Sequence, residues 1–273
     1  MIDALLPCVG GAAALAASAR WNWWRPIVSD GLPVLAYHKV GDPPAGSKLK
    51  KLWVSAREFR WQMQYLLRHG YTPLLFRELY EAETGKRPWP AKPVLVTFDD
   101  GYANNAEVAY PIMKEVGVKS NIFLVYEDMD KHNSWHNPAS EPWIRMLTWK
   151  QVLELRDTGI VEFGSHTMKH PNLPDLTLEE ARWELTESKR RLEEKLGTPV
   201  LGFAYPYGGG AYVPAIRQAA REAGYRYDFA FRQGMSPRRW DPEKDGPIKR
   251  LFIRGDDNRF DFHLNLTRGK ARF

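Results

Sequence analysis

Cysteine is nearly absent from this sequence, which has one, Cys8, among 273 residues. A lone cysteine excludes internal disulfides and multi-cysteine zinc sites, so a bound metal would need histidine and carboxylate ligands. Clusters of like charge are also missing. The 39 basic and 33 acidic residues are interspersed, so nothing indicates a nucleic-acid partner. The net charge of +6 favours anionic surroundings such as a phospholipid surface or an acidic envelope polymer.

The amino-terminal apolar stretch is short. Residues 4–19 carry no charge, but a comfortable membrane span needs about 20 apolar residues. Cys8 follows a proline, which fits a lipoprotein cleavage site poorly, and no basic residue precedes the stretch as in a secretory signal. The three tryptophans within 21–24 would suit a membrane interface. The stretch could be a marginal membrane anchor or a helix that packs on the protein, and the sequence leaves both alternatives. We therefore divide the chain into an apolar segment, 1–24, and one domain, 25–273.

From residue 33 onward, short apolar runs alternate with stretches of helical period, which is typical of βα units around a parallel sheet. One continuous α/β domain is therefore expected. Two stretches without a period, 126–148 and 232–247, are expected as long loops, which in compact domains are often functional. A helix capped at Thr148 should follow the first. The strand candidates are 33–37, 94–98, 122–125, 160–163, 200–205, 226–231 and 248–253.

Two further helix starts are marked by capping boxes, Ser55 with Glu58 and Thr177 with Glu180, in which each side chain satisfies a free backbone N–H. The second helix should end at Gly197. Its apolar residues recur with helical period on one face and the rest are mostly charged, which indicates a solvent-exposed outer helix. The predicted buried face comprises Leu178, Ala181, Leu185, Leu192 and Leu196.

Two adjacent aspartates, Asp99 and Asp100, follow the apolar run 94–98 and should emerge together at the end of that strand. Two neighbouring carboxylates repel each other unless a cation is present, and a divalent metal would relieve that repulsion. An ordinary Asp-Gly turn completed by Gly101 explains the same residues without any function. The aspartates alone therefore leave a metal site and a turn as alternatives.

Two histidines, His166 and His170, are four residues apart. On a helical turn this spacing places both imidazoles on one side and suits a single metal ion, zinc above others. The zincin motif has the same spacing, but Thr167 stands where that motif needs its general-base glutamate, so a metalloprotease is disfavoured. Paired histidines also cap helices or pack in cores, and this structural role remains the alternative.

Three motifs follow predicted strands, at the positions where βα barrels build their active sites: TFDDG at 97–101, SHTMKH at 165–170 and FAYPYGG at 203–209. In this order they resemble carbohydrate esterase family 4, the polysaccharide deacetylases. Two other segments are similar to family sequences, namely PVLAYH at 33–38 and GIVEFGS at 159–165.

The resemblance implies a distorted (β/α) barrel with about seven parallel strands. It further implies that Asp100, His166 and His170 bind a divalent metal, either Zn²⁺ or another ion such as Co²⁺ or Ni²⁺. Three protein ligands leave a position for water. Asp99 would then be the general base as this water attacks an acetyl group.

Residues that contact the substrate are implied by the third motif. The backbone N–H of Tyr207, positioned by Pro206, would donate to the oxyanion that develops during the reaction. Gly208 and the two glycines after it would let a sugar approach the backbone closely.

The sequence departs from the usual family pattern in two places. The family's arginine near Ala204, which orients the base, is missing, and we expect Arg250 or Arg254 from the last strand to replace it beside Asp99. The Leu-x-His pattern that supplies a general acid is also missing. His38 is the best replacement, because it ends the first predicted strand and would face the barrel mouth. Weaker candidates are His132, His136 and His263.

These residues predict a hydrolase that removes N-acetyl groups from an N-acetylglucosamine-containing polysaccharide, in an extracytoplasmic or periplasmic location with 4–19 as a candidate anchor. The missing arginine resembles the poly-N-acetylglucosamine deacetylase subgroup. One alternative is a deacylase of a lipid-linked sugar, which would fit the candidate anchor. Another is a non-catalytic carbohydrate-binding barrel, although a structural zinc site usually has four protein ligands rather than three.

Overall fold

The computed structural model describes residues 20–28 and 30–272. The apolar stretch 4–19 and Cys8, on which the anchor and lipoprotein interpretations depend, lie outside the described residues. Within the described part, no helix has the length and apolar character needed to cross a membrane.

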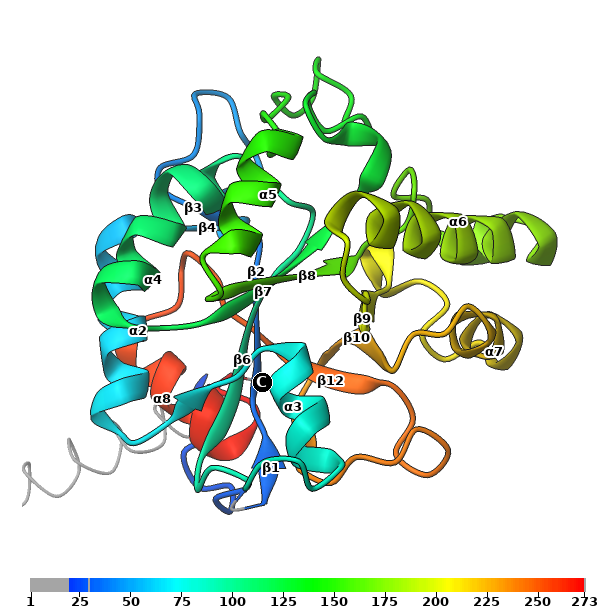
Figure 1. Cartoon of the computed structure of the whole chain (residues 1–273). Helices are drawn as coiled ribbons and strands as arrows, with labels where there is room; N and C mark the ends of the chain where they lie inside the picture. Colours follow the sequence, from blue (N-terminus) through cyan, green and yellow to red (C-terminus); the bar gives the residue numbers. More distant parts are fainter. Residues whose placement is uncertain (1–19, 29, 273) are drawn as a thin grey trace, which may run out of the picture.

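Within the described residues, seven parallel strands form a closed barrel in the order β2-β12-β10-β9-β8-β7-β6, and β6 pairs back with β2 (Figure 1). The predicted distorted (β/α) barrel is thereby confirmed. The distortion lies where β8 and β9 share a single residue pair and where the register of β10 and β12 shifts. The strands are β2 (Val34–Tyr37), β6 (Pro93–Phe98), β7 (Ser120–Leu124), β8 (Val161–Ser165), β9 (Gly202–Ala204), β10 (Tyr227–Gln233) and β12 (Ile248–Phe252).

Five strands of two residues each were not predicted, because two residues are too few to show an alternating pattern. One of them, β5, pairs in parallel with the first two residues of β6. The expectation of a loop over 232–247 was partly wrong, since β10 extends into this stretch and β11 lies within it. The five are β1 (Gly31–Leu32), β3 (Lys39–Val40), β4 (Trp53–Val54), β5 (Thr72–Pro73) and β11 (Ser236–Pro237).

Helices surround the barrel in Figure 1. The helices that begin after Thr177 and Thr148 each have a complete capping box, in which both reciprocal hydrogen bonds form. At Ser55 only the hydroxyl half forms, because Glu58 turns to Arg57 and Arg259 instead. The described α-helices are α2 (Ala56–Arg68), α3 (Phe76–Glu83), α4 (Tyr110–Val116), α5 (Trp149–Asp157), α6 (Leu178–Leu196), α7 (Pro214–Glu222) and α8 (Arg259–Arg268). Shorter turns are η1 (Lys50–Leu52), η2 (Asn105–Ala109), η3 (Tyr126–Asp128), η4 (Leu173–Asp175) and η5 (Pro206–Gly208).

The predicted buried face of α6 is mostly correct. Four of its five residues are buried, and the helix ends at Gly197 in a left-handed conformation. The exception is Leu178, at the first helical position, whose side chain is 44% exposed. The start of the helix extends beyond the surface it packs against, so helical period alone misplaced this residue.

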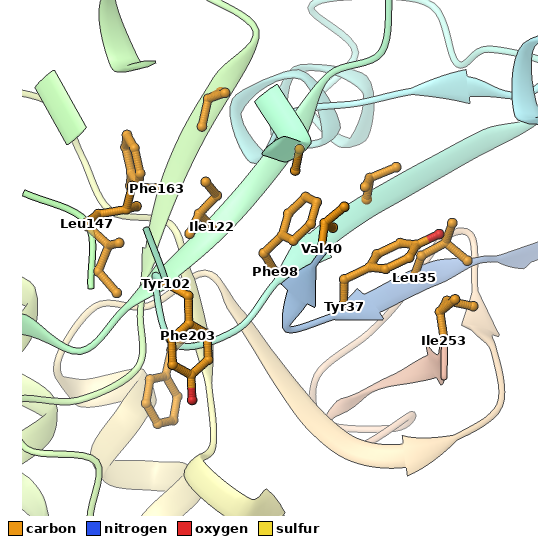
Figure 2. Close-up of a cluster of buried hydrophobic side chains, with 14 of the residues drawn as sticks. Leu35, Tyr37, Val40, Phe98, Tyr102, Ile122, Leu147, Phe163, Phe203 and Ile253 are labelled. Atoms are coloured by element: carbon orange, nitrogen blue, oxygen red, sulfur yellow. The ribbon is translucent and has the colours of Figure 1, made fainter. Parts of the chain in front are cut away.

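Apolar side chains fill both faces of the barrel wall, because successive residues of a strand point to opposite sides. The larger cluster joins the outer face to the helices, and Figure 2 shows Tyr37, Phe98 and Ile122 within it. The smaller cluster includes Phe123 and Phe229, with Phe76 of α3 packed against both. Aromatic side chains occupy the interior, so the barrel is a packed core rather than a pore.

Candidate metal centre and active site

The predicted aspartates and histidines follow three different strands and converge at the carboxyl end of the barrel. Asp99 and Asp100 come directly after β6, and His166 comes directly after β8. His38 follows β2, so it stands beside the aspartates through the pairing of β2 with β6.

Asp100, His166 and His170 form a buried cluster whose ligand atoms all lie within 4.8 Å of one another. The Nε2 atoms of His166 and His170 are 3.4 and 3.3 Å from Asp100 Oδ1. Two imidazole nitrogens and a carboxylate oxygen facing one point are a donor set that suits zinc and similar divalent ions. The residues present therefore fit a three-ligand metal site with room for further ligands.

The histidine pair does not lie on a helical turn, so that prediction was wrong. His166 to His170 form an irregular loop after β8, in which Thr167 and His170 have positive φ angles of 72° and 59°. Asp100 also has a positive φ, 74°. Residues other than glycine rarely adopt this conformation, so the surrounding contacts must hold the three positions in place.

The two imidazoles are oriented in different ways. His166 Nδ1 lies 2.7 Å from the carbonyl oxygen of Ala204, which can only accept, so Nδ1 carries the proton and the Nε2 lone pair faces Asp100. His170 is held by packing instead, its ring stacked on Trp135 at 4.2 Å. Its buried Nδ1 has no hydrogen-bond partner among the described residues.

Glu184 of α6 fixes the loop between the histidines. Its carboxylate accepts the backbone N–H groups of Met168 and Lys169, at 2.8 and 3.2 Å. The exposed helix α6 therefore contributes one buried side chain to the support of the metal centre.

Arg250 of β12 holds Asp99 through two parallel hydrogen bonds of 2.6 and 2.9 Å. Its Nε donates to the carbonyl oxygen of Ala230, and the side chain is fully buried. Burial alone would raise the pKa of Asp99, but the guanidinium charge and its hydrogen bonds hold that pKa below the ordinary value. The other arginine considered, Arg254, instead pairs with Asp256 at the surface.

His38 Nε2 lies 3.8 Å from Asp99 Oδ2, which places the imidazole beside this carboxylate. Burial lowers the pKa of His38, although the carboxylates of Asp99 and Asp100 act in the opposite direction. The His38 carbonyl accepts a hydrogen bond from Asn105, which secures the chain beyond β2.

Pro206, Tyr207 and Gly208 form η5 after β9, where Tyr207 has a left-handed φ of 56°. The exposed Tyr207 ring meets the His170 ring edge to face at 4.6 Å, which brings this turn to the metal cluster. A Cβ atom on Gly208 would lie 2.6 Å from the Cβ of Phe231. Glycine is therefore required at 208 for packing against β10, besides any approach by a sugar.

The weaker histidine candidates make other contacts. His263 of α8 is hydrogen-bonded to the hydroxyl of Tyr65 at 2.7 Å. His136 is hydrogen-bonded to Asn133 in the loop after β7. The ring of His132 lies roughly parallel to the ring of Trp143.

Two residues near the site were missed by sequence reasoning. Trp135 stacks on His170, but it lies in a stretch without a period that gave no sign of this contact. Lys39 is fully buried with its Nζ 4.2 Å from the centre of the Tyr102 ring, and Tyr102 lies two residues after Asp100. A lysine at a strand end is ordinarily a surface residue, so only the structure reveals its burial.

Comparison with known proteins agrees with this geometry. A family profile described as polysaccharide deacetylase matches residues 86–227, which is more than half of the chain. The chain belongs to the polysaccharide deacetylase family. The matched region includes both aspartates and both histidines of the metal cluster.

Several similar proteins cover most of this deacetylase domain. YxkH of Bacillus subtilis (strain 168), whose name assigns it to the polysaccharide deacetylases, is 30% identical over 76% of this chain and 67% of its own. The poly-beta-1,6-N-acetyl-D-glucosamine N-deacetylase of Staphylococcus aureus (strain MRSA252) is 28% identical over 78% and 71%. The structure of BC0361, a polysaccharide deacetylase from Bacillus cereus, is similar with a TM-score of 0.72 and 26% identity, covering 86% of this chain and 69% of that one.

Proposed function

We propose that this deacetylase is a divalent-metal-dependent enzyme that removes N-acetyl groups from a poly-N-acetylglucosamine polysaccharide. The observation that carries the proposal is the carboxylate of Asp99, clamped by Arg250 immediately beside the three-ligand cluster of Asp100, His166 and His170. The substrate class is supported by the printed name of the Staphylococcus aureus relative.

Asp100, His166 and His170 would hold the metal, for which zinc is the proposed ion because the donor set is two imidazoles and one carboxylate. When bound, the metal polarises the acetyl carbonyl and acidifies water. The low pKa of Asp99 keeps this residue ionised at neutral pH, so it can accept a proton from the attacking water. Arg250 occupies both carboxylate oxygens and thereby fixes their position.

His38 is the proposed general acid for the leaving amine. Its lowered pKa keeps it neutral at first, and a proton accepted by Asp99 can pass to Nε2, 3.8 Å away. As the C–N bond breaks, this proton goes to the amine nitrogen, so that water and amide become a free amine and acetic acid, which then ionises to acetate. The Tyr207 N–H is the proposed donor to the negative charge that develops on the acetyl oxygen, worth about 3–4 kcal/mol.

A location at the cell envelope is part of the proposal, as is the division into segment 1–24 and domain 25–273. Trp23 and Ile27 are 43% and 65% exposed just after the uncharged stretch, beside the cation Arg25, which suits an anionic membrane surface. Fractionation of cells that express the full chain or residues 25–273 tests it. Recovery of the full chain entirely in the soluble fraction would count against membrane association.

The activity test is acetate release from soluble β-1,6-linked N-acetylglucosamine oligomers by protein stripped of metal and resupplied with zinc. We expect zinc-dependent release that is lost in Asp99→Asn. Asp256→Asn, which removes a surface carboxylate paired with Arg254, is the matched control and should retain activity. Full activity after metal removal, or in Asp99→Asn, would refute the respective assignment.

A further inference from the structure

A pocket with a volume of about 500 Å³ lies beside the loop that carries the metal-binding histidines, with Lys169 of that loop in its lining. Most of its lining comes from the segment between β7 and α5, which rises at the top of Figure 1, and Lys169 completes it. None of the roles proposed above uses this pocket. Its lining residues are Glu127, Asp128, Lys131, His132, Asn133, Ser134, Trp143 and Lys169.

The pocket shares its structural elements with the metal centre. The N–H groups of Tyr126 and Glu127 donate to the carbonyl oxygens of Thr167 and Met168, which joins one side of the pocket to the loop that carries the metal-binding histidines. On the other side, the chain passes from the pocket directly into Trp135, whose ring stacks on His170. Lys169 itself immediately precedes His170. These connections place the pocket next to the elements that carry and support the metal-binding histidines.

Trp143 is the aromatic surface of the pocket. Its indole is 53% exposed, although its Nε1 donates to the His136 carbonyl at 2.9 Å. The His132 ring lies roughly parallel to it, with an interplanar angle of 26°. A large aromatic ring that stays exposed while its polar edge is anchored presents a fixed apolar face to a ligand.

The remaining lining is polar and carries both signs of charge. Lys131 and Lys169 provide ammonium donors, and Glu127 provides a carboxylate that lies 3.8 Å from Lys169. Mixed charge does not suit a simple anion or cation, and the polar lining does not suit an apolar ligand. An aromatic face surrounded by donors and acceptors suits a sugar ring, which has apolar C–H faces and hydroxyls at its edge.

We infer that this pocket binds a saccharide unit of the polymer next to the unit being deacetylated, with Trp143 as the stacking surface. The inference rests on the proposed function for its choice of polymer. On this inference, Trp143 determines the preference for long substrates, although it lies away from the bond that is broken.

The test compares kcat/KM for a β-1,6-linked N-acetylglucosamine pentamer with that for the monomer. In Trp143→Ala the pentamer-to-monomer ratio should fall about 3- to 10-fold, as expected for the loss of one aromatic stacking contact. Trp143→Phe keeps a ring and should recover most of the ratio. Trp23→Ala removes a similarly exposed tryptophan outside the pocket and should leave the ratio unchanged.

An unchanged ratio in Trp143→Ala would overturn the inference. So would equal losses on monomer and pentamer, because they would show that Trp143 only supports the loop. Calorimetric binding of the pentamer to Asp99→Asn, with and without Trp143→Ala, separates this inference from the proposed function. If wild type releases no acetate from any oligomer, the proposed function fails, whereas pentamer binding that is weakened by Trp143→Ala still supports the saccharide pocket.

Discussion

The ion pair of Arg250 and Asp99 should couple the two residues strongly in the stability of the protein. Both side chains are buried and joined by two charge-assisted hydrogen bonds. Arg250→Met leaves a buried carboxylate without its partner, which costs about 3–5 kcal/mol of the free energy of unfolding. Asp99→Asn similarly leaves a buried guanidinium uncompensated. The double variant removes both charges, so it should cost less than the sum of the single variants.

We therefore expect a coupling free energy of about 2–3 kcal/mol from a double-mutant cycle. The measurement is urea denaturation with a chelator present, so that metal binding does not contribute. The matched cycle uses Arg254→Met and Asp256→Asn, a pair at the surface, where coupling should stay below about 1 kcal/mol because solvent screens the charges. Additive effects of Arg250→Met and Asp99→Asn would refute the argument that burial makes this pair interdependent.

Three further predictions concern the metal, a buried cation and pH. His170→Ala should weaken zinc binding more than about 100-fold in a chelator competition, while His263→Ala, on α8, should not; equal effects would contradict the ligand assignment. Lys39→Met should raise the free energy of unfolding by roughly 1–2 kcal/mol, because it removes a buried ammonium with no hydrogen-bond partner among the described residues. A less stable variant would show that the attraction of the ammonium to the nearby aromatic rings outweighs the cost of burying it. Burial raises the pKa of Glu162 to about 7, so the native state binds this proton more tightly than the unfolded state does. Wild type should therefore lose stability as the pH rises from the pKa of Glu162 in the unfolded chain to its pKa in the native state. Glu162→Gln should match wild type near pH 4 and melt at a higher temperature at pH 8; a melting-temperature difference independent of pH would refute this.

The barrel strands could be predicted because buried parallel strands consist of nearly continuous apolar residues, as in 94–98. Their arrangement into a ring came from the family resemblance rather than from the runs themselves. The short strands escaped prediction because two residues carry no pattern. Leu178 was misplaced because helical period does not reveal where the packing surface under a helix ends.

The site was partly predictable for a different reason. The family resemblance implied that an arginine should hold Asp99, and the last predicted strand offered Arg250 and Arg254 as candidates. Only the structure distinguishes them, since Arg250 binds Asp99 and Arg254 pairs with Asp256. The local shape of the histidine loop was not predictable, because the positive φ angles of Thr167 and His170 depend on tertiary contacts such as those from Glu184. The contact of Trp135 with His170 also arises only after the chain folds, since nothing in their separate sequences links them.

The position of β12 has a consequence for the order in which the enzyme matures during synthesis. This strand is the last of the ring to be made, yet it must insert between β2 and β10 before the barrel can close. A nascent chain that ends before residue 248 already contains both aspartates and both metal-binding histidines, but it lacks Arg250. The ribosome therefore completes the metal ligands well before the residue that clamps Asp99, so an unfinished chain can acquire metal-binding groups without acquiring the clamped carboxylate.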